Sequence, residues 1–494
     1  MSTPIDGSGA ATTVIDDRGF FGHPRGLSTL FFTEFWERFS FYGLKALLVL
    51  YMTKSLNFDE AYSGLIAGTY FSAVYWTPLI GGYLADKVFG ARRSVLIGGV
   101  IIACGHFSMA FHTMGNFYAG LMLIAAGTGM LKPNVSAMVG SLYPTGDQRR
   151  DAGFSIFYMG INLGALTAPF IVGNLGEKVD WHYGFAAAGV GMVFGLLQYV
   201  LGSKRLSSVG NVPQRKKEPV AADIKEVRNI DVVTIILSVA GGVIGFMLGY
   251  LSGHILVSGL FPGVAFLFAG YLIGVVRHLR GEELKRVLVI FILFLFSALF
   301  WMSFEQASTT LTLFADRLTN RVVFGYEIKA SQFQAIEPFF LVVFAPVFAW
   351  VWVKLGRRDP SSPAKFAYGL LFAGLAFSIM AYASTLTTKG LVSPLWLVSV
   401  YLFQTMGELC LSPVGLSTVT KLSPARMVGL MMGVWFLSIS VGDYFAGLAL
   451  GFFHENAEGA LLHLFGSVAL LTFGAALVLV LLTPFIKRLM PKTA

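Results

Sequence analysis

A stretch of charged and aromatic residues lies inside the first long apolar segment of this 494-residue chain. Five polar side chains recur there at helical spacing, and a helix places all of them on one face: Glu34, Glu37, Arg38, Tyr42 and Lys45. An ionisable group costs roughly 2.5 kcal/mol or more at the centre of a membrane helix, so this face must meet protein or water rather than lipid. The stripe therefore predicts one wall of a pathway through a membrane.

The composition of the whole chain indicates an integral membrane protein, because 55% of its residues are hydrophobic and only 13% are charged. The first two dozen residues have no basic start followed by a short apolar core, so we expect no cleaved signal peptide and a cytoplasmic N-terminus. The net charge of +9 does not require a nucleic acid partner, since basic residues that flank membrane spans on the inner side explain it.

Fourteen apolar segments are long enough to cross a bilayer as helices. Six come first, at 27–55, 61–86, 92–112, 117–142, 152–176 and 183–203. Two follow at 231–252 and 255–277, and six more at 287–315, 331–354, 365–385, 393–420, 427–451 and 461–487. The predicted domains are a cytoplasmic tail (1–26), a six-helix bundle (27–203), a cytoplasmic linker with two accessory spans (204–286), a second bundle (287–487) and a cytoplasmic tail (488–494).

The basic residues fit this topology. Most of the 36 lysines and arginines fall on loops that it places inside, and only Arg38, Lys45 and Lys132 lie within spans. Two groups of six spans predict parallel repeats about an axis along the membrane normal, with a site between them. The two extra spans carry almost no charge, so we expect them to be lipid-facing accessory helices.

Counting residues from the span ends, at about 1.5 Å per residue, gives each buried charge an approximate depth. Lys45 and Glu305 share one level, and Lys132 and Glu408 share a second. Each pair would join the first group of spans to the second. Protonating the acid relieves the buried charge reversibly, so a proton could release such a pair. Static ion pairs that fix helix register are the alternative interpretation.

Other residues lie near these charges. Trp301, Trp435 and Phe436 precede acidic residues by one or two helical turns, so their rings are candidate pocket walls. Asn162 lies within a small-residue segment, where helix packing and ligand contact are equally open. The sequence has no phosphate-binding glycine loop of the Walker type, so nothing indicates ATP. We expect no metal and no cofactor, with protons as the coupling ion.

Four separated segments resemble the proton-dependent oligopeptide transporters, a branch of the major facilitator superfamily, and a further segment resembles the superfamily. Residues 34–38 are similar to that family's ExxER signature, and residues 82–93 to the loop signature of the superfamily. Residues 127–134, 153–164 and 407–415 are similar to family segments in spans 4, 5 and 10. The resemblance covers nearly the whole chain. It implies an all-α membrane protein of two six-helix bundles plus two accessory helices.

The resemblance also implies import of di- and tripeptides by alternating access, driven by protons that enter with them. The residues that it places at the peptide are Arg38, Tyr42, Tyr75, Lys132, Asn162, Trp301, Glu337, Glu408, Ser412, Trp435 and Phe436. The residues that it assigns to proton coupling and gating are Glu34, Glu37, Arg38, Lys45, Lys132, Glu305 and Glu408. Arg38 and Lys132 would meet the peptide's carboxylate, and Asn162 and Glu408 its amino end.

Four residues depart from the family's pattern. Phe41 stands where tyrosine is usual, and Lys45 stands where arginine is common, which exchanges a two-pronged donor for a point charge. Phe304 precedes Glu305 where many bacterial members have a second acid, and Glu337 stands where many have asparagine. These departures leave the peptide preference and the number of protons open.

We therefore hypothesise a proton-coupled peptide symporter, monomeric and without enzymatic activity, in a bacterial-type inner membrane. Peptide and proton binding would close an outer gate at Lys45 and Glu305 and disengage Lys132 from Glu408. One alternative is a relative that transports nitrate or another small anion. A multispanning membrane enzyme would need a nucleophile-base set or metal-ligand cluster, which the sequence lacks. A non-transporting sensor would usually add a soluble signalling domain, which is also absent.

Overall fold

The computed structural model of the chain describes residues 19–144, 147–207, 209–210, 231–251 and 257–490. These residues form fourteen long helices, as the apolar segments predict. Eleven helical segments among them are long and apolar enough to cross a membrane, so the chain is a multi-pass membrane protein. Residues 211–230 of the predicted linker and most of both predicted tails lie outside the described residues.

Six long helices form the first bundle. They are α1 (Arg25–Lys54), α2 (Glu60–Leu84), α3 (Ala91–Met109), α4 (Met114–Ser141), α5 (Arg149–Ala168) and α7 (Trp181–Gly202). Short segments extend three of them: η1 (Ala85–Phe89) after α2, η2 (Pro169–Gly173) and α6 (Asn174–Lys178) after α5, and η3 (Ser203–Leu206) after α7. The widened turn η2 begins at Pro169, which has no N–H to donate to the preceding turn of α5.

Six further long helices form the second bundle. They are α10 (Gly281–Phe304), α12 (Ile336–Leu355), α13 (Ser362–Leu386), α14 (Leu395–Leu422), α15 (Val428–Ala449) and α16 (Ala460–Leu489). Shorter elements join or extend them: η6 (Glu305–Ser308), α11 (Thr310–Arg317), β1 (Val322–Val323), β2 (Tyr326–Glu327), η7 (Ala330–Ala335), η8 (Gly356–Arg358), η9 (Thr387–Lys389), η10 (Ala425–Met427) and η11 (Leu450–Phe452). The strands pair antiparallel, with Val322 opposite Glu327.

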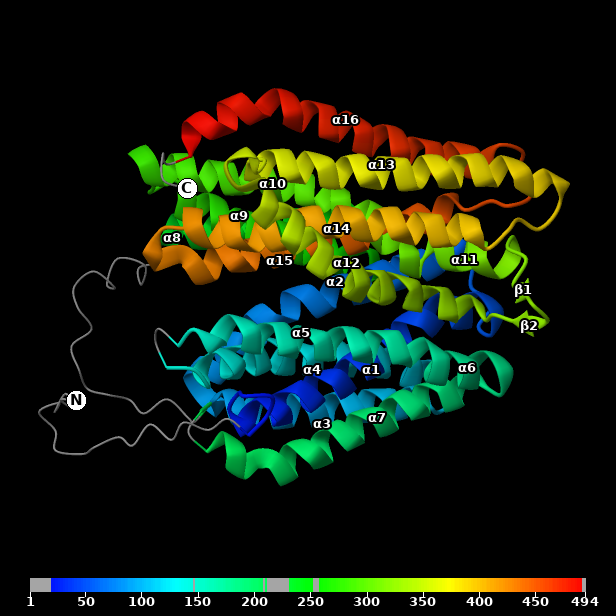
Figure 1. Cartoon of the computed structure of the whole chain (residues 1–494), viewed down its shortest axis with the longest axis horizontal. Helices are drawn as coiled ribbons and strands as arrows, with labels where there is room; N and C mark the ends of the chain where they lie inside the picture. Colours follow the sequence, from blue (N-terminus) through cyan, green and yellow to red (C-terminus); the bar gives the residue numbers. More distant parts are fainter. Residues whose placement is uncertain (1–18, 145–146, 208, 211–230, 252–256, 491–494) are drawn as a thin grey trace, which may run out of the picture.

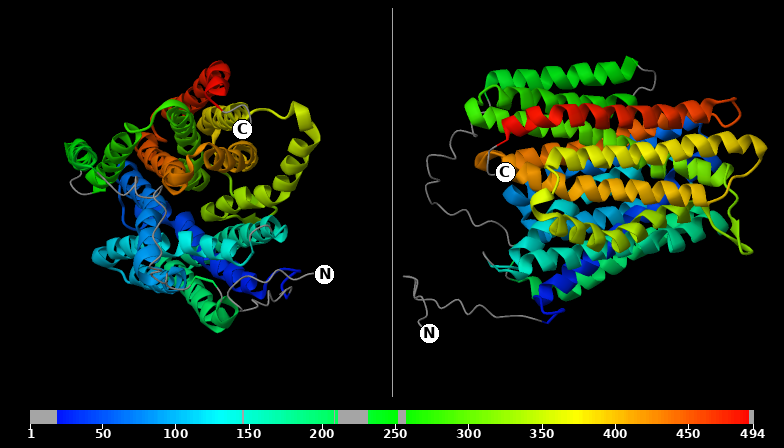
Figure 2. Two further views of the ribbon diagram at one scale, coloured as in Figure 1. Left: turned by 90° about the vertical axis from the view of Figure 1, so that its left-hand side faces the viewer. Right: turned by 45° about the horizontal axis from the view of Figure 1, so that its top comes forward.

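The two accessory helices, α8 (Val232–Leu251) and α9 (Val257–Val276), pack closely against each other. Glycines at every fourth position of α8 allow this approach, since a Cβ at Gly245 would come within 2.2 Å of the Pro262 carbonyl oxygen. Of the 20 residues of α8, only Thr234, Gly245 and Gly249 are buried. The helix pair therefore lies on the outside of the two bundles, where α9 packs beside α2 and α15 (Figure 2).

The bundles lie side by side with their helices roughly parallel (Figure 1). We call the end that carries β1, β2 and α11 the hairpin face, and the opposite end, where α1 begins and α16 ends, the termini face. One continuous apolar cluster crosses from the first bundle into the hairpin half of the second through Leu311, Phe314 and Phe465. The termini half of the second bundle has a separate cluster. The bundles are thus packed together most tightly near the hairpin face.

The contact between α2 and α15 illustrates this packing. A Cβ at Gly64 would come within 2.1 Å of the Gly447 carbonyl oxygen. Deeper in the same interface, the Ser72 hydroxyl donates to the Ser440 carbonyl (2.7 Å) and the Ser440 hydroxyl donates to the Ser72 carbonyl (3.0 Å). Such close, hydrogen-bonded contacts hold helices together where the surroundings are apolar.

The expected span at 287–315 lies within one apolar segment that is long enough to cross a membrane, Gly281–Arg317. This segment is not one continuous helix, because it breaks at Glu305 into η6 and then α11. Hydroxyl side chains after Glu305 compete for backbone and side-chain acceptors: Ser308 donates to the Glu305 carbonyl (2.9 Å), and Thr309 to the Ala446 carbonyl (3.2 Å). The backbone of Thr309 leaves the helical region at φ −123° and ψ −96°. Glu305 therefore lies at a turn rather than within a continuous helix.

Candidate functional site

A cavity of about 1060 Å³ lies between the two bundles. Helices α2, α4 and α5 line it from the first bundle, and α12, α14 and α15 from the second. Its deeper wall includes Tyr75 and Lys132, and its rim lies in the parts of α4, α12 and α14 that end at the termini face. Tyr158 and Leu416 on its wall are 45% and 42% exposed. The cavity is therefore open to solvent toward the termini face.

Four of the predicted site residues line this cavity: Tyr75, Lys132, Asn162 and Phe436. The Lys132 ammonium lies 4.2 Å from the centre of the Tyr75 ring, and it forms no ion pair with any residue that the structure describes. Asn162 donates its amide to the Tyr158 carbonyl (2.9 Å), which leaves its side-chain oxygen free to accept. An ammonium without a carboxylate partner at a cavity wall is suited to bind an anionic group.

The charged stripe of α1 lies directly behind this wall, fully buried. Arg38 Nε is 3.2 Å from Glu34 Oε1 and also contacts the Glu37 carboxylate, and all three side chains are at most 3% exposed. Glu34 Oε2, Glu37 Oε1 and Arg38 Nη2 have no hydrogen-bond partner among the described residues. Two carboxylates around one guanidinium carry a net negative charge, which a proton can balance.

The first predicted pair is present. Lys45 Nζ of α1 lies 2.5 Å from Glu305 Oε2 of η6, with Lys45 8% and Glu305 3% exposed. The pair connects the first bundle to the second on the hairpin side of the cavity. Further ion pairs cross between the bundles at the hairpin face, Lys54 with Asp316 (2.6 Å) and Arg317 with Glu60 (2.8 Å). The hairpin face is therefore closed.

The second predicted pair, Lys132 with Glu408, is not formed in this structure. Lys132 rests on the Tyr75 ring, and Glu408 Oε2 is buried without a hydrogen-bond partner among the described residues. The charges nearest to Glu408 are those of Glu337, Glu305 and Lys45. In the mechanism expected from the sequence, Lys132 and Glu408 separate when the inner side opens. Their separation here is what that mechanism expects of an open cavity.

The remaining predicted ligands of a peptide lie away from the cavity surface. Trp435 packs inside the second bundle, against Phe366 and so close to Gly415 that a Cβ there would come within 2.0 Å of the indole. Trp301 is 7% exposed and stacks edge-on against Phe304. Three other polar groups, the Tyr42 ring, the Glu337 carboxylate and the Ser412 hydroxyl, also do not line the cavity.

Asp443 of α15 is a buried acid that the sequence predictions left without a role. It is 2% exposed, and neither carboxylate oxygen has a hydrogen-bond partner among the described residues. Its neighbours include Glu305 and Lys45. The signal was present in the sequence, because an acidic residue within a membrane span is rare and usually functional.

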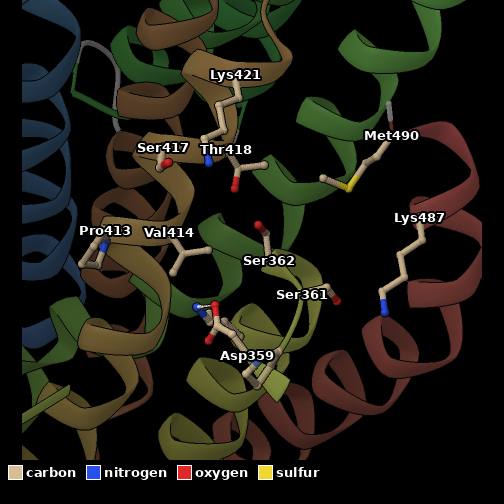
Figure 3. Close-up of a pocket in the computed structure, with 12 residues that line it drawn as sticks. Asp359, Ser361, Ser362, Pro413, Val414, Ser417, Thr418, Lys421, Lys487 and Met490 are labelled. Atoms are coloured by element: carbon tan, nitrogen blue, oxygen red, sulfur yellow. Dashed lines mark hydrogen bonds and ion pairs between the residues drawn. The ribbon is translucent and has the colours of Figure 1, made fainter. Parts of the chain in front are cut away.

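Two other polar features lie outside the central cavity. A pocket of about 570 Å³ within the second bundle, lined by α13, α14 and α16, holds an ion pair of Lys365 with Asp359 (2.7 Å; Figure 3). At the hairpin face, His112, Asp180 and His182 bring three potential metal ligands within 4.8 Å of one another. Neither feature contains a residue that the sequence predictions assigned to the site.

Comparisons with known proteins agree with this architecture. The family model described as "POT family" matches residues 92–462. A solved structure of a peptide transporter POT in complex with sulfate superimposes with a TM-score of 0.84 and 43% identity, covering 96% of this chain and 97% of that one.

The chain belongs to the POT family.

Similar members of the POT family come from other bacteria. The peptide transporter YePEPT of Yersinia enterocolitica is 40% identical, with 98% of each chain covered. The di-/tripeptide transporter of Lactococcus lactis subsp. cremoris is 37% identical, with 96% of this chain and 98% of the relative covered. The fold predicted from the sequence, two six-helix bundles of the major facilitator type with two accessory helices, is thereby confirmed.

The structure accounts for two departures from the POT pattern. Phe41 is 2% exposed, and its ring lies 5.1 Å from the Arg38 guanidinium, so it contributes a cation–π contact where a tyrosine would add a hydroxyl. Phe304 packs against Phe300 and Trp301 in the apolar core beside Glu305. A second acid at position 304 would be buried in that core without a partner.

Proposed function

We propose that this chain is a proton-coupled symporter that imports di- and tripeptides across the bacterial inner membrane. Both termini are cytoplasmic in this proposal, so the termini face is the inner side and the hairpin face the outer side. The names of the relatives support peptides as the substrate, and membership of the POT family supports proton coupling. The cavity is formed within one chain, which supports a monomer as the working unit.

One observation carries the proposal: the cavity between the bundles is open at one face while ion pairs close the other. A carrier that works by alternating access must bind its substrate between two halves and expose the site to one side at a time. With the termini face on the inner side, as proposed, the closed gate at Lys45 and Glu305 makes this conformation the inward-open one. Breaking that pair and closing the rim of the cavity would produce the outward-open conformation.

The charges at the cavity suit a short zwitterionic peptide. Lys132, with Arg38 behind it, provides positive charge for the peptide's carboxylate. Asn162 and the acids Glu337 and Glu408 provide acceptors for its ammonium group. A cavity of about 1060 Å³ accommodates two or three residues with varied side chains, and its largely aromatic and aliphatic walls tolerate that variation.

Protons act through the buried acids. Four buried acids lie in or beside clusters that contain at least as many acids as bases: Glu34, Glu37, Glu305 and Glu408. Protonation of one acid therefore changes which carboxylate each base can pair with. A proton on Glu305 would release Lys45 and open the outer side. Return of the pair after peptide and proton entry would close that side and lead to the inward-open conformation.

Competition for uptake of labelled dialanine into proteoliposomes tests the substrate class. We expect unlabelled di- and tripeptides to compete, and nitrate and free alanine not to compete. Competition by nitrate but not by peptides would replace the peptide proposal with anion transport, because Lys132 and Arg38 could bind a small anion too. Saturable peptide binding without any uptake would instead indicate a sensor.

A further inference from the structure

Asp443 lies against the closed gate. The neighbouring Gly442 faces the helix that leads to Glu305, since a Cβ there would come within 2.4 Å of Trp301 Cβ. On the other side, the Asp443 carbonyl oxygen would lie 3.2 Å from a Cβ at Gly68 of α2. The side chain is thus enclosed by α15, α10 with η6, and α2, in the region where the two bundles meet.

Four titratable groups from other elements act on the Asp443 carboxyl group. They are Glu305 of η6, Lys45 of α1, Lys132 of α4 and Tyr75 of α2. Neither oxygen of the Asp443 carboxyl group has a hydrogen-bond partner among the described residues. A buried carboxylate without a hydrogen-bond donor is strongly disfavoured relative to the neutral acid. The absence of a donor therefore favours a proton on Asp443.

The charges at the gate lead to the same conclusion. The Lys45 ammonium is 2.5 Å from Glu305 and neutralises one carboxylate. The Lys132 ammonium is directed at the Tyr75 ring instead, 4.2 Å from its centre. A second ionised carboxylate at this buried position would remain without a counter-charge, which burial strongly disfavours.

We propose that Asp443 is a proton-binding site of the outer gate, which takes up a proton as the gate closes and carries it as a neutral carboxylic acid. This inference rests on the proposed function and adds one acid to those that the family motifs supply. When the gate opens, water reaches the Asp443 carboxylate, and a proton from the outer solution binds to it as an O–H bond. When Lys45 returns to Glu305, this proton is enclosed with Asp443. It leaves to water in the cavity that is open on the inner side, before Lys45 separates from Glu305 again.

The variant Asp443→Asn tests this site, because asparagine keeps the shape and the neutral charge of the protonated acid but cannot bind or release the proton. In proteoliposomes of the full chain, we expect dialanine counterflow within about twofold of the wild type. We expect the proton-to-peptide ratio, measured from the reversal potential, to fall by one. Asp151→Asn, the same change at an exposed acid of α5, should leave the ratio unchanged. An unchanged ratio in Asp443→Asn would overturn the proposal.

A spectroscopic measurement keeps the proposal testable even if the variant does not fold. Infrared spectra of wild-type protein with ¹³C-labelled aspartate side chains should show an isotope-shifted C=O stretch of a protonated aspartic acid at neutral pH. Absence of that shift would overturn the proposal. This readout needs no transport, so it separates failure at Asp443 from failure of the proposed function, which would appear as wild-type uptake that ignores the proton gradient.

Discussion

Glu305 of η6 accepts from the Lys45 ammonium at 2.5 Å, and this contact joins the two bundles at a point where both side chains are almost fully buried. The position of Glu305 at the break between α10 and α11 aims its carboxylate at α1. Breaking a buried pair by removing one partner costs about 3 to 5 kcal/mol, because the other charge stays buried. The pair can therefore hold the hairpin face closed and still be released by one proton.

The variant Lys45→Ala tests the strength of this gate. We expect it to lower the free energy of unfolding by about 3 kcal/mol, because the Glu305 carboxylate stays buried without its partner. Thermal unfolding in detergent measures the difference. Lys285→Ala, in the exposed pair of Lys285 with Glu282 (2.7 Å), should change stability by at most about 1 kcal/mol. Equal effects of the two variants would contradict a buried gate.

The variant Gly64→Ala tests the contact that closes the hairpin face between α2 and α15. Its Cβ would come within 2.1 Å of the Gly447 carbonyl oxygen, so the helices must separate, at a cost of about 1 to 3 kcal/mol. We expect distances between spin labels across the hairpin face to lengthen. Gly82→Ala on the same helix has no atom within 4 Å of the new Cβ and should leave the distances unchanged. No difference between the variants would show that this contact does not limit closure.

The carboxyl group of Asp180, at the hairpin face, should make a pH-dependent contribution to the free energy of unfolding. Burial would raise the pKa of this carboxyl group, but its hydrogen bonds from the His182 backbone N–H (2.8 Å) and imidazole lower the pKa overall. A carboxyl group whose pKa is lower in the folded state stabilises the fold at pH values above its unfolded-state pKa of about 3.9. This stabilisation is lost as the pH falls through the folded-state pKa.

Asp180→Ala should therefore lower the free energy of unfolding by about 1 kcal/mol at pH 6, through loss of the cap of α7, and by less at pH 3. Chemical or thermal unfolding across this range measures the effect. Asp180→Asn, which can still cap the helix, should lose less at pH 6. A constant effect of the alanine variant across the range would contradict the charge contribution.

The variant Lys132→Gln tests how the cavity holds the substrate. A charged hydrogen bond contributes about 1.5 to 3 kcal/mol, so we expect dialanine to bind about tenfold or more weakly. Dialanine amide lacks the carboxylate and should bind wild type and variant equally. Calorimetry on the four combinations isolates the interaction of Lys132 with the carboxylate. An equal loss of affinity for both ligands would show that Lys132 supports the cavity without contacting that group.

The membrane spans were predictable because an apolar segment of sufficient length has few alternatives to a membrane helix. The approximate depths of Lys45 and Glu305 were predictable for a related reason, since helical rise converts residue number into height. The break after Glu305 was not predictable, because Thr309 donates to the Ala446 carbonyl of α15, an acceptor that only the folded chain supplies. Local sequence does not contain those neighbours.

The residue types of the site were predictable from the sequence, but the conformation in which the structure holds them was not. Sequence places Lys132 and Glu408 at one level, but it cannot tell which conformation the chain occupies, and here the two are apart. Asp443 needed the fold, because its relation to Glu305 depends on how α15 packs against η6. The roles of the lining and gating residues stay predictions that the experiments above address.

Uptake of labelled dialanine into proteoliposomes, with and without an inward proton gradient, tests the central claim most directly. We predict accumulation of dialanine above its outside concentration only when the gradient is present, and loss of this accumulation, with counterflow retained, in Glu305→Gln. Accumulation that is the same without the gradient, or that persists in Glu305→Gln, would contradict proton coupling through the Lys45–Glu305 gate.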